Sequence, residues 1–446
     1  MRLLDTTSFE LRSGEQSSFR QEGYAILSHR WVGLEITFDE LKNHTAELRT
    51  GTRPLGSPQA DKIRGACETA RNQGIKWLWI DTCCINKNSA TEESESINSM
   101  FKWYREAKLC ITYLADVKRD AGLPIASTKI FKRTYDDEPS EWFFRGWTLQ
   151  ELLAPQDMQF FDMDWTYMGT KREMADTLAR ITGINAQYLT GAEHFGEACI
   201  AAKMSWMAHR TTTREEDMAY SMVGIFGVTM TPQYGEGRGA FMRLQEILLT
   251  THLFDESLFA WKMPEPNAGV KYSVRKGNWA PGEWGLLAAS PEWFGGCGDI
   301  ETIAEVTGAR SFVMTPQGLR APIRRHLYNG EMKALDGMFG VLWITIVGSI
   351  PAAIGFQYVK HLLNKKAKED FAFVLNCYRR DASGQGANVA IYLRPTTVDR
   401  VRYRNKSAPP YLVSKRIRCD ELDVKSKPIT DFGEGVVLQP RPGFTS

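Results

Sequence analysis

Chemically versatile side chains follow two hydrophobic runs in the first part of the chain. The first run ends with Ser28, His29, Arg30 and Trp31, and the second, IKWLWIDTCCI, delivers Asp81. A hydroxyl, an imidazole, a guanidinium, an indole and a carboxylate at one site fit a nucleotide-like or sugar-phosphate ligand better than an apolar one. The simpler alternatives are that His29 is a structural histidine and that Asp81 only caps a turn.

Glu151 lies in an unusual aromatic segment, EWFFRGWTLQELL, at residues 141–153. One continuous helix over 142–153 would turn Trp142 toward a sheet and place Trp147 and Glu151 on nearly the opposite face. A carboxylate beside aromatic rings on that face is either an exposed glutamate or part of a cleft. In a cleft the rings would stack on a ligand, and partial desolvation would raise the pKa of the carboxyl.

The remaining motifs indicate no metal or phosphate loop. Eight cysteines contain no C-x-x-C pair, and the chain has no H-E-x-x-H, so the common zinc signatures are excluded. Cys83 and Cys84 are interpreted as buried small residues. YGEGRGAF lacks G-K-[ST] and a preceding strand. Thr213 and Glu216 predict a capping box, and the charges at 214–217 are interpreted as a helix start with local ion pairs.

The elements that would position these side chains alternate between strand and helix. Strands are predicted at 24–31, 75–85, 109–117 and 158–162, and helices at 61–73, after Ser89, and at 142–153. This alternation predicts right-handed crossovers and a parallel sheet covered on both faces. In such a sheet ligands bind outside the carboxyl ends of the strands, which is where the first group of side chains lies.

Three regions follow one another along the chain. Residues 1–170 are predicted to form an α/β domain and residues 171–264 a helical segment. Residues 265–446 are predicted to form an antiparallel β-rich accessory domain, with runs such as FAFVLNC and NVAIYLR between turns. Within it, residues 337–359 carry no charge. They are interpreted as a buried element, a membrane-spanning helix or a gene-model artefact.

The composition and the first residues of the chain argue against several classes of function. The 446 residues carry 55 Lys and Arg against 53 Asp and Glu, a net charge of +2, which is too balanced for a nucleic-acid-binding chain. The first residues, MRLLDTTSFELRSG, contain no apolar signal region. We therefore expect a cytoplasmic protein without disulfides, with no nucleic-acid partner, and with membrane contact not favoured.

Four blocks resemble the heterokaryon-incompatibility (HET) domain of fungi: YAILSHRW, WLWIDTCCINK, ESINSMFKWYREA and FRGWTLQELLAP. The continuation from MSWMAHRTTTREEDMAYSMVGIF resembles the segment that often follows this domain, and together they cover roughly residues 1–261. Asn86 stands where an aspartate is common in the family. The resemblance implies an effector of non-self recognition and programmed cell death.

HET domains in turn resemble TIR domains. Ser28–His29 matches the end of the first TIR strand, Asp81 the aspartate after the second, and W-T-L-Q-E-L at 147–152 places Glu151 at the glutamate of NAD-cleaving TIR domains, with Thr148 in place of a cysteine. This resemblance implies a flavodoxin-like sheet of order 2-1-3-4-5. It also implies cleavage of NAD or a related nucleotide at the nicotinamide–ribose bond.

The resemblance assigns roles to the site residues. Glu151 would stabilise the oxocarbenium-like ribose, Arg30 would hold the diphosphate, and Trp31 or Trp147 would stack on a ring. NAD is then a substrate, and no cofactor is expected. The alternatives are a non-catalytic signalling adaptor that acts by self-association and a membrane-disrupting protein that acts through 337–359. Self-association and an upstream incompatibility or receptor protein are the expected partners.

Overall fold

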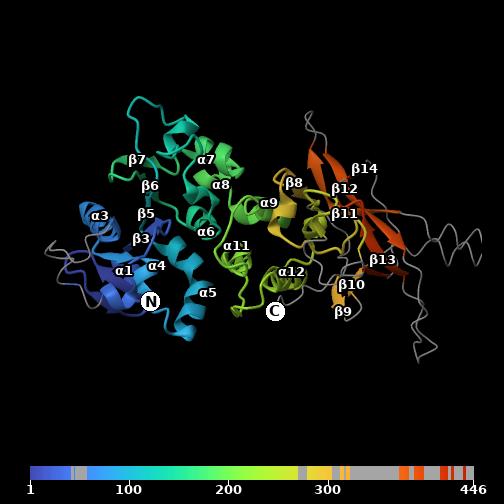
Figure 1. Ribbon diagram of the computed structural model, residues 1–446, viewed down its shortest axis with the longest axis horizontal. Helices are drawn as coiled ribbons and strands as arrows, with labels where there is room; N and C mark the ends of the chain where they lie inside the picture. The colour runs from blue at the N-terminus through green and yellow to red at the C-terminus, as the bar shows by residue number, and fades with distance from the viewer. Residues whose placement is uncertain are drawn as a thin grey trace, which may run out of the picture. The chain divides into compact units, whose positions relative to one another are not determined.

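The computed structural model describes residues 1–41, 45, 58–269, 279–303, 312–315, 318–321, 371–380, 386–395, 412–419, 423–425 and 435–437. They form two compact units, which are described separately. The first contains Met1–Ala198 and His209–Ala240, and the second contains Cys199–Ala208 and Phe241–Ser446, so the predicted segment 171–264 contributes to both (Figure 1). The uncharged stretch 337–359 lies outside the described residues. Within the described ranges, no helix has the length and apolar character needed to cross a bilayer.

A seven-stranded mixed sheet forms the centre of the first unit. Its order is β2-β1-β4-β3-β5-β6-β7, and the four central strands β4-β3-β5-β6 are parallel. In chain order these four read 2-1-3-4, as predicted. The edge strands β1, β2 and β7 pair antiparallel, so a wholly parallel sheet is wrong. The strands are β1 Arg2–Asp5, β2 Leu11–Ser13, β3 Tyr24–His29, β4 Trp77–Trp79, β5 Leu109–Tyr113, β6 Met158–Phe161 and β7 Tyr167–Thr170.

Helices cover both faces of this sheet. All six residues of β3 are buried, as expected for the centre of a two-sided sheet. The crossovers β3–α3–β4 and β4–α5–β5 run in opposite directions across it, and right-handed connections then place α3 (Pro58–Asn72) and α5 (Ala90–Glu106) on opposite faces (Figure 1). α6 (Trp147–Leu153) contacts β3 and α5 on the α5 face, and α11 (Val223–Phe226) packs there as well.

Three predicted strands are longer than the observed ones. The strand expected at 75–85 ends at Trp79, because Asp81–Cys84 forms a helical turn (α4) closed by the bond from Cys84 N to Ile80 O at 2.8 Å. The strands expected at 24–31 and 109–117 end at His29 and Tyr113. All eight cysteines are buried and free, Cys83 and Cys84 included.

The other helices are short and connect these elements. Ser89 caps α5 as predicted, accepting a hydrogen bond from Glu92 N at 3.4 Å. Further helices of the first unit, among those with described bounds, are α1 Gln16–Glu22, η1 Thr128–Phe131, η2 Glu141–Phe144, α7 Ala175–Thr182, α8 Ala186–Thr190, η3 Phe195–Glu197 and α10 Asp217–Tyr220.

The second unit combines short helices with a β-sheet. FAFVLNC and NVAIYLR lie in β11 and β12, which pair antiparallel as predicted, whereas β13 and β15 pair in parallel. Buried Arg416 on β13 donates to Phe259 O at 3.0 Å and to Trp261 O. The elements are α9 Ile200–Ser205, α12 Gly239–Thr251 (which begins at the end of the first unit), η4 Glu256–Phe259, η5 Pro291–Phe294, β8 Ile300–Thr302, β9 Val313–Thr315, β10 Gly318–Ala321, β11 Phe371–Arg380, β12 Gly386–Pro395, β13 Leu412–Ile417, β14 Asp423–Lys425 and β15 Gly435–Val437.

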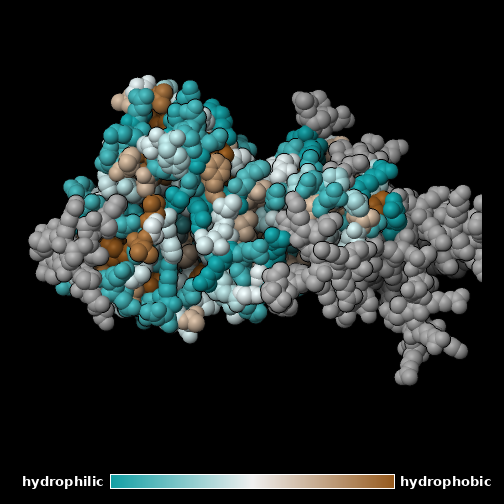
Figure 2. Space-filling model, viewed as in Figure 1, coloured by the Kyte–Doolittle hydropathy of each residue, from teal (hydrophilic) through white to brown (hydrophobic). Residues whose placement is uncertain are grey.

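Hydrophilic side chains cover most of the visible face of the first unit, and hydrophobic ones interrupt it in places (Figure 2). Three of the exposed apolar side chains of this unit lie close together in the sequence just after β3: Trp31, Val32 and Leu34. Leu34 is 93% exposed, so it contributes nothing to the core of this unit.

Candidate functional site

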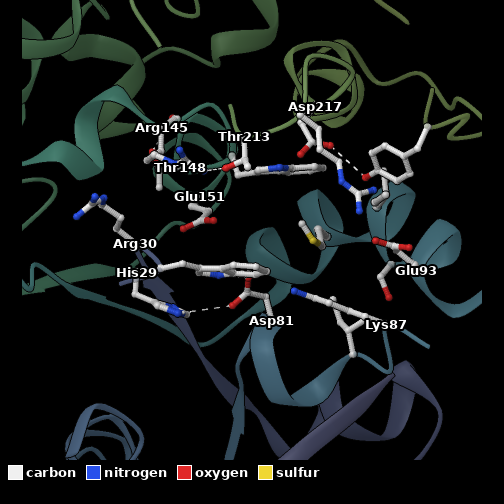
Figure 3. Close-up of a pocket in the computed structure, with 18 residues that line it drawn as sticks. His29, Arg30, Asp81, Lys87, Glu93, Arg145, Thr148, Glu151, Thr213 and Asp217 are labelled. Carbon is white, nitrogen blue, oxygen red and sulfur yellow. Dashed lines mark hydrogen bonds and ion pairs between the residues drawn. The ribbon is translucent and has the colours of Figure 1, made fainter. Parts of the chain in front are cut away.

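A pocket of about 310 Å³ opens at the carboxyl end of β3, within the first unit. This volume lies in the range of about 300–1,000 Å³ that is usual for small-molecule sites. Its walls come from four parts of the chain: the end of β3, the α4–α5 region, α6, and the segment 213–234 (Figure 3). The lining residues are His29, Arg30, Trp31, Asp81, Ile85, Lys87, Glu93, Ser96, Ile97, Met100, Arg145, Trp147, Thr148, Glu151, Thr213, Arg214, Asp217 and Tyr234.

Glu151 is a buried carboxyl that lines this pocket, with a relative exposure of only 7%. Its Oε2 accepts a hydrogen bond from Ser28 Oγ at 2.6 Å, and Ser28 Oγ in turn accepts one from Trp142 Nε1 at 2.9 Å. Figure 3 shows the carboxyl between Arg145, Thr148, Thr213 and Asp217 on one side and His29 and Asp81 on the other. Glu151 therefore faces the tip of the central strand.

The local fold explains how Trp142 and Glu151 both reach Ser28. The segment 142–153 is not one helix: η2 ends at Phe144, Arg145 is extended, and α6 starts at Trp147. The break is held by Gly146 N bonding Thr211 O at 2.9 Å and Thr211 N bonding Phe144 O at 2.7 Å. The prediction that these two side chains lie on opposite faces of one helix is therefore wrong.

Burial perturbs the acid–base chemistry of Glu151. Desolvation raises its pKa to about 8, opposed by the hydrogen bond from Ser28 and reinforced by the nearby carboxylate of Asp81. Arg210, itself buried, and the hydroxyl of Tyr104 act in the direction that lowers it. The free protein thus holds a carboxyl that changes its ionisation in the neutral to mildly alkaline range, which is a property of functional carboxyls.

His29 and Asp81 face each other beside Glu151. His29 Nε2 lies 3.8 Å from Asp81 Oδ1, and both atoms are buried without a hydrogen-bond partner among the described residues. Burial lowers the pKa of His29 well below its usual value, so its ring is neutral at neutral pH. Burial raises the pKa of Asp81. The hydrogen-bonding capacity of both atoms is thus unmet by the described residues, which is unusual for buried polar atoms.

Arg30, Trp31 and Trp147 also line the pocket, with different partners. Trp31 Nε1 donates to Asp81 Oδ2 at 2.8 Å, and its indole is 48% exposed, so a ligand can reach the ring. The guanidinium of Arg30 is paired with the carboxylate of Glu141. Arg30 therefore lines the pocket with its charge paired to a neighbouring carboxylate, and its expected role in holding a diphosphate stays a prediction.

Several pocket residues were missed by the sequence reasoning. Lys87 Nζ lies 3.5 Å from the centre of the Trp31 ring. Arg145, Arg214, Asp217 and Tyr234 contribute to the opposite wall. No local pattern distinguished these four charged residues and one tyrosine from ordinary surface residues. The predicted capping box at Thr213 is wrong, because the carboxylate of Glu216 accepts the backbone N–H groups of Gly235 and Gly237, at 2.7 and 2.9 Å.

A buried ion pair lies behind His29 and was also missed. Lys62 on α3 donates to both carboxylate oxygens of Glu35 at 2.6 and 2.5 Å, and Glu35 Oε2 lies 4.0 Å from His29 Nε2. Lys62 also contributes to the lowered pKa of His29. The ammonium group of Lys62 therefore helps to keep the imidazole neutral.

Comparison with known proteins shows what the first part of this unit is similar to. Residues 24–138 match the family model described as "Heterokaryon incompatibility protein (HET)", which confirms the predicted HET domain. The chain is 40% identical over 234 residues to the vegetative incompatibility protein HET-E-1 of Podospora anserina. The match covers 50% of this chain but only 16% of that protein. No solved structure matches significantly.

Proposed function

We propose that this HET domain acts in heterokaryon incompatibility by cleaving the nicotinamide–ribose bond of NAD or a related nucleotide. The name of the similar protein supports the biological role. The observation that carries the chemistry is the buried carboxyl of Glu151, which is held by Ser28 and lines a pocket of suitable size. A TIR-like relationship agrees with the parallel strand order and with the positions of Ser28, Asp81 and Glu151.

The proposed reaction needs no general acid at the leaving group. The bond between ribose C1′ and the ring nitrogen breaks, and both electrons stay on that nitrogen, which neutralises the cationic nicotinamide. A water oxygen bonds to C1′ of the oxocarbenium-like ribose, and its extra proton passes to a carboxylate and then to solvent. Ionised Glu151 would stabilise the positive charge that develops on the sugar.

Ligand binding itself would favour the ionised form of Glu151. The nicotinamide of NAD carries a positive charge, and an opposite charge within a few ångströms lowers the pKa of a carboxyl. His29 and Asp81, which line the pocket beside Glu151, would contact the ribose. Trp31 or Trp147 would stack on a ring of the ligand.

Nicotinamide release by the full chain tests this proposal, measured alone and as a fusion that forces clustering. We expect Glu151→Gln to reduce release at least about 100-fold, whereas Glu95→Gln at an exposed position of α5 keeps it. Ser28→Ala removes the donor to Glu151 and should shift the alkaline rise of kcat/KM to higher pH. Wild-type protein that leaves NAD intact in both states would refute the enzymatic proposal.

A second candidate function is a non-catalytic adaptor that acts by self-association. The exposed apolar side chains of Val32 and Leu34, next to the pocket residue Trp31, favour it because such side chains can be covered by a partner. The two functions differ at Glu151: an adaptor keeps its incompatibility phenotype in Glu151→Gln, and an enzyme loses it. Val32→Ser with Leu34→Ser should abolish self-association in the adaptor.

A further inference from the structure

We propose that Arg145, Thr213 and Arg214 form an anion subsite, which binds a phosphate group of the ligand. The inference rests on the proposed function for the identity of that ligand, a phosphorylated nucleoside. It differs from the sequence-based expectation, which gave this task to Arg30. The subsite would be supplied by residues beyond 24–138, the range that matches the HET family model.

The pairing of the pocket cations carries this inference. Arg30, Lys87, Arg145 and Arg214 all line the pocket. Arg30 is paired with Glu141, and Lys87 lies over Trp31 and interacts with Asp81. In the part of the chain that the structure describes, neither Arg145 nor Arg214 has a carboxylate oxygen within 4.0 Å. Arg214 interacts at longer range with the carboxylates of Asp217 and Glu216. A guanidinium that lines a pocket without a direct ion pair keeps N–H donors that can bind a phosphate.

The contacts that these two arginines do make hold them in place and leave donors free. Arg145 Nη2 lies 3.0 Å from Thr213 Oγ1, and Arg214 lies 4.0 Å from the centre of the Tyr234 ring. The neighbouring carboxylate of Asp217 accepts the hydroxyl of Tyr234 at 3.1 Å. A guanidinium has five N–H donors, so one hydrogen bond or one ring contact leaves most of them available.

The backbone fixes this wall before any ligand arrives. The reciprocal bonds between Thr211 and the Phe144–Gly146 stretch join the segment 209–240 to the start of α6. Arg145 and Thr213 lie on one side of Glu151, whereas His29 and Asp81 lie on the other (Figure 3). A ligand could thus place a sugar hydroxyl at His29 and Asp81, its reacting carbon at Glu151 and a phosphate at Arg145.

Binding measurements on the full chain with Glu151→Gln test the subsite without turnover. Three probes are titrated calorimetrically: pyrophosphate, NAD, and nicotinamide riboside, which lacks phosphate. We expect Arg145→Gln and Arg214→Gln each to weaken pyrophosphate and NAD about tenfold and to leave nicotinamide riboside within about twofold. Arg238→Gln is the matched control, because it removes the same charge from the same segment outside the pocket.

The outcomes separate this inference from the proposed function. Failure of pyrophosphate to bind, or equal weakening of all three probes, overturns the subsite even if wild-type protein releases nicotinamide. The subsite is also overturned if Arg238→Gln weakens pyrophosphate binding as much as Arg145→Gln does. The effect would then come from the overall positive charge of the segment and not from a direct contact. Arginine-dependent binding of pyrophosphate by a chain that never consumes NAD supports the subsite and refutes the enzymatic proposal.

Discussion

Replacing Glu151 by glutamine should make the first unit more stable at alkaline pH than the wild-type protein. The folded protein holds this carboxyl at a pKa of about 8, whereas the value for a solvated glutamate is 4.5. At a pH between these two pKa values, the carboxyl of residue 151 is protonated in the folded state and ionised in the unfolded state. Wild-type stability therefore falls as the pH rises through this window, and the glutamine variant lacks this loss.

The size of the effect follows from the width of the window. Each pKa unit corresponds to about 1.4 kcal/mol, so the difference between wild type and variant should change by on the order of 4 kcal/mol between pH 5 and pH 9. The whole free energy of unfolding of a typical domain is only about 5–15 kcal/mol. The glutamine amide oxygen still accepts from Ser28, so the fold of the pocket should persist.

Amide hydrogen exchange in β3 and β5 is the appropriate assay, because it reports on the first unit in a chain with two units. Exchange is measured at pH 5, 7 and 9 for both proteins, with the intrinsic rate corrected for pH. The lowered pKa of His29 also makes stability depend on pH, but it is common to both proteins and cancels in the difference. A difference that stays within about 0.5 kcal/mol across this range would show that Glu151 is solvated, and the electrostatic reasoning would be wrong.

Two further predictions concern packing. Gly224→Ala should destabilise the first unit by about 1–3 kcal/mol, because its new Cβ would lie 2.1 Å from Cβ of Phe101 on α5. The control is Gly239→Ala, where the nearest atom to the new Cβ is 3.7 Å away. Equal free energies of unfolding for the two variants would contradict the prediction. Arg416→Met should destabilise the second unit by about 2–5 kcal/mol, because two buried carbonyls lose their hydrogen-bond donor. The control, Arg380→Met at an exposed position, should change the thermal unfolding temperature little. Similar decreases in unfolding temperature for both variants would count against this reasoning.

Much of the first unit could be predicted from local sequence patterns. The parallel pairing of the four central strands follows from strand–helix alternation, whereas their order was implied only by the TIR resemblance. The burial of Cys83 and Cys84 agrees with their interpretation as small core residues. Side chains at the end of β3 could be nominated as pocket residues because parallel strands present their carboxyl ends to ligands. Four sequence blocks in order predicted the resemblance to the HET domain, and residues 24–138 match that family model.

Tertiary structure alone decided how the pocket is completed. Periodicity assigned one helix to 142–153, but bonds between Thr211 and residues 144–146 break it and turn Glu151 toward Ser28. The same pairing brings Arg214 to the pocket, and Glu141 rather than a ligand neutralises Arg30. Each of these results depends on a hydrogen bond or an ion pair between residues distant in sequence. Helical and strand periods record only neighbours along the chain, so they contain no information on such partners.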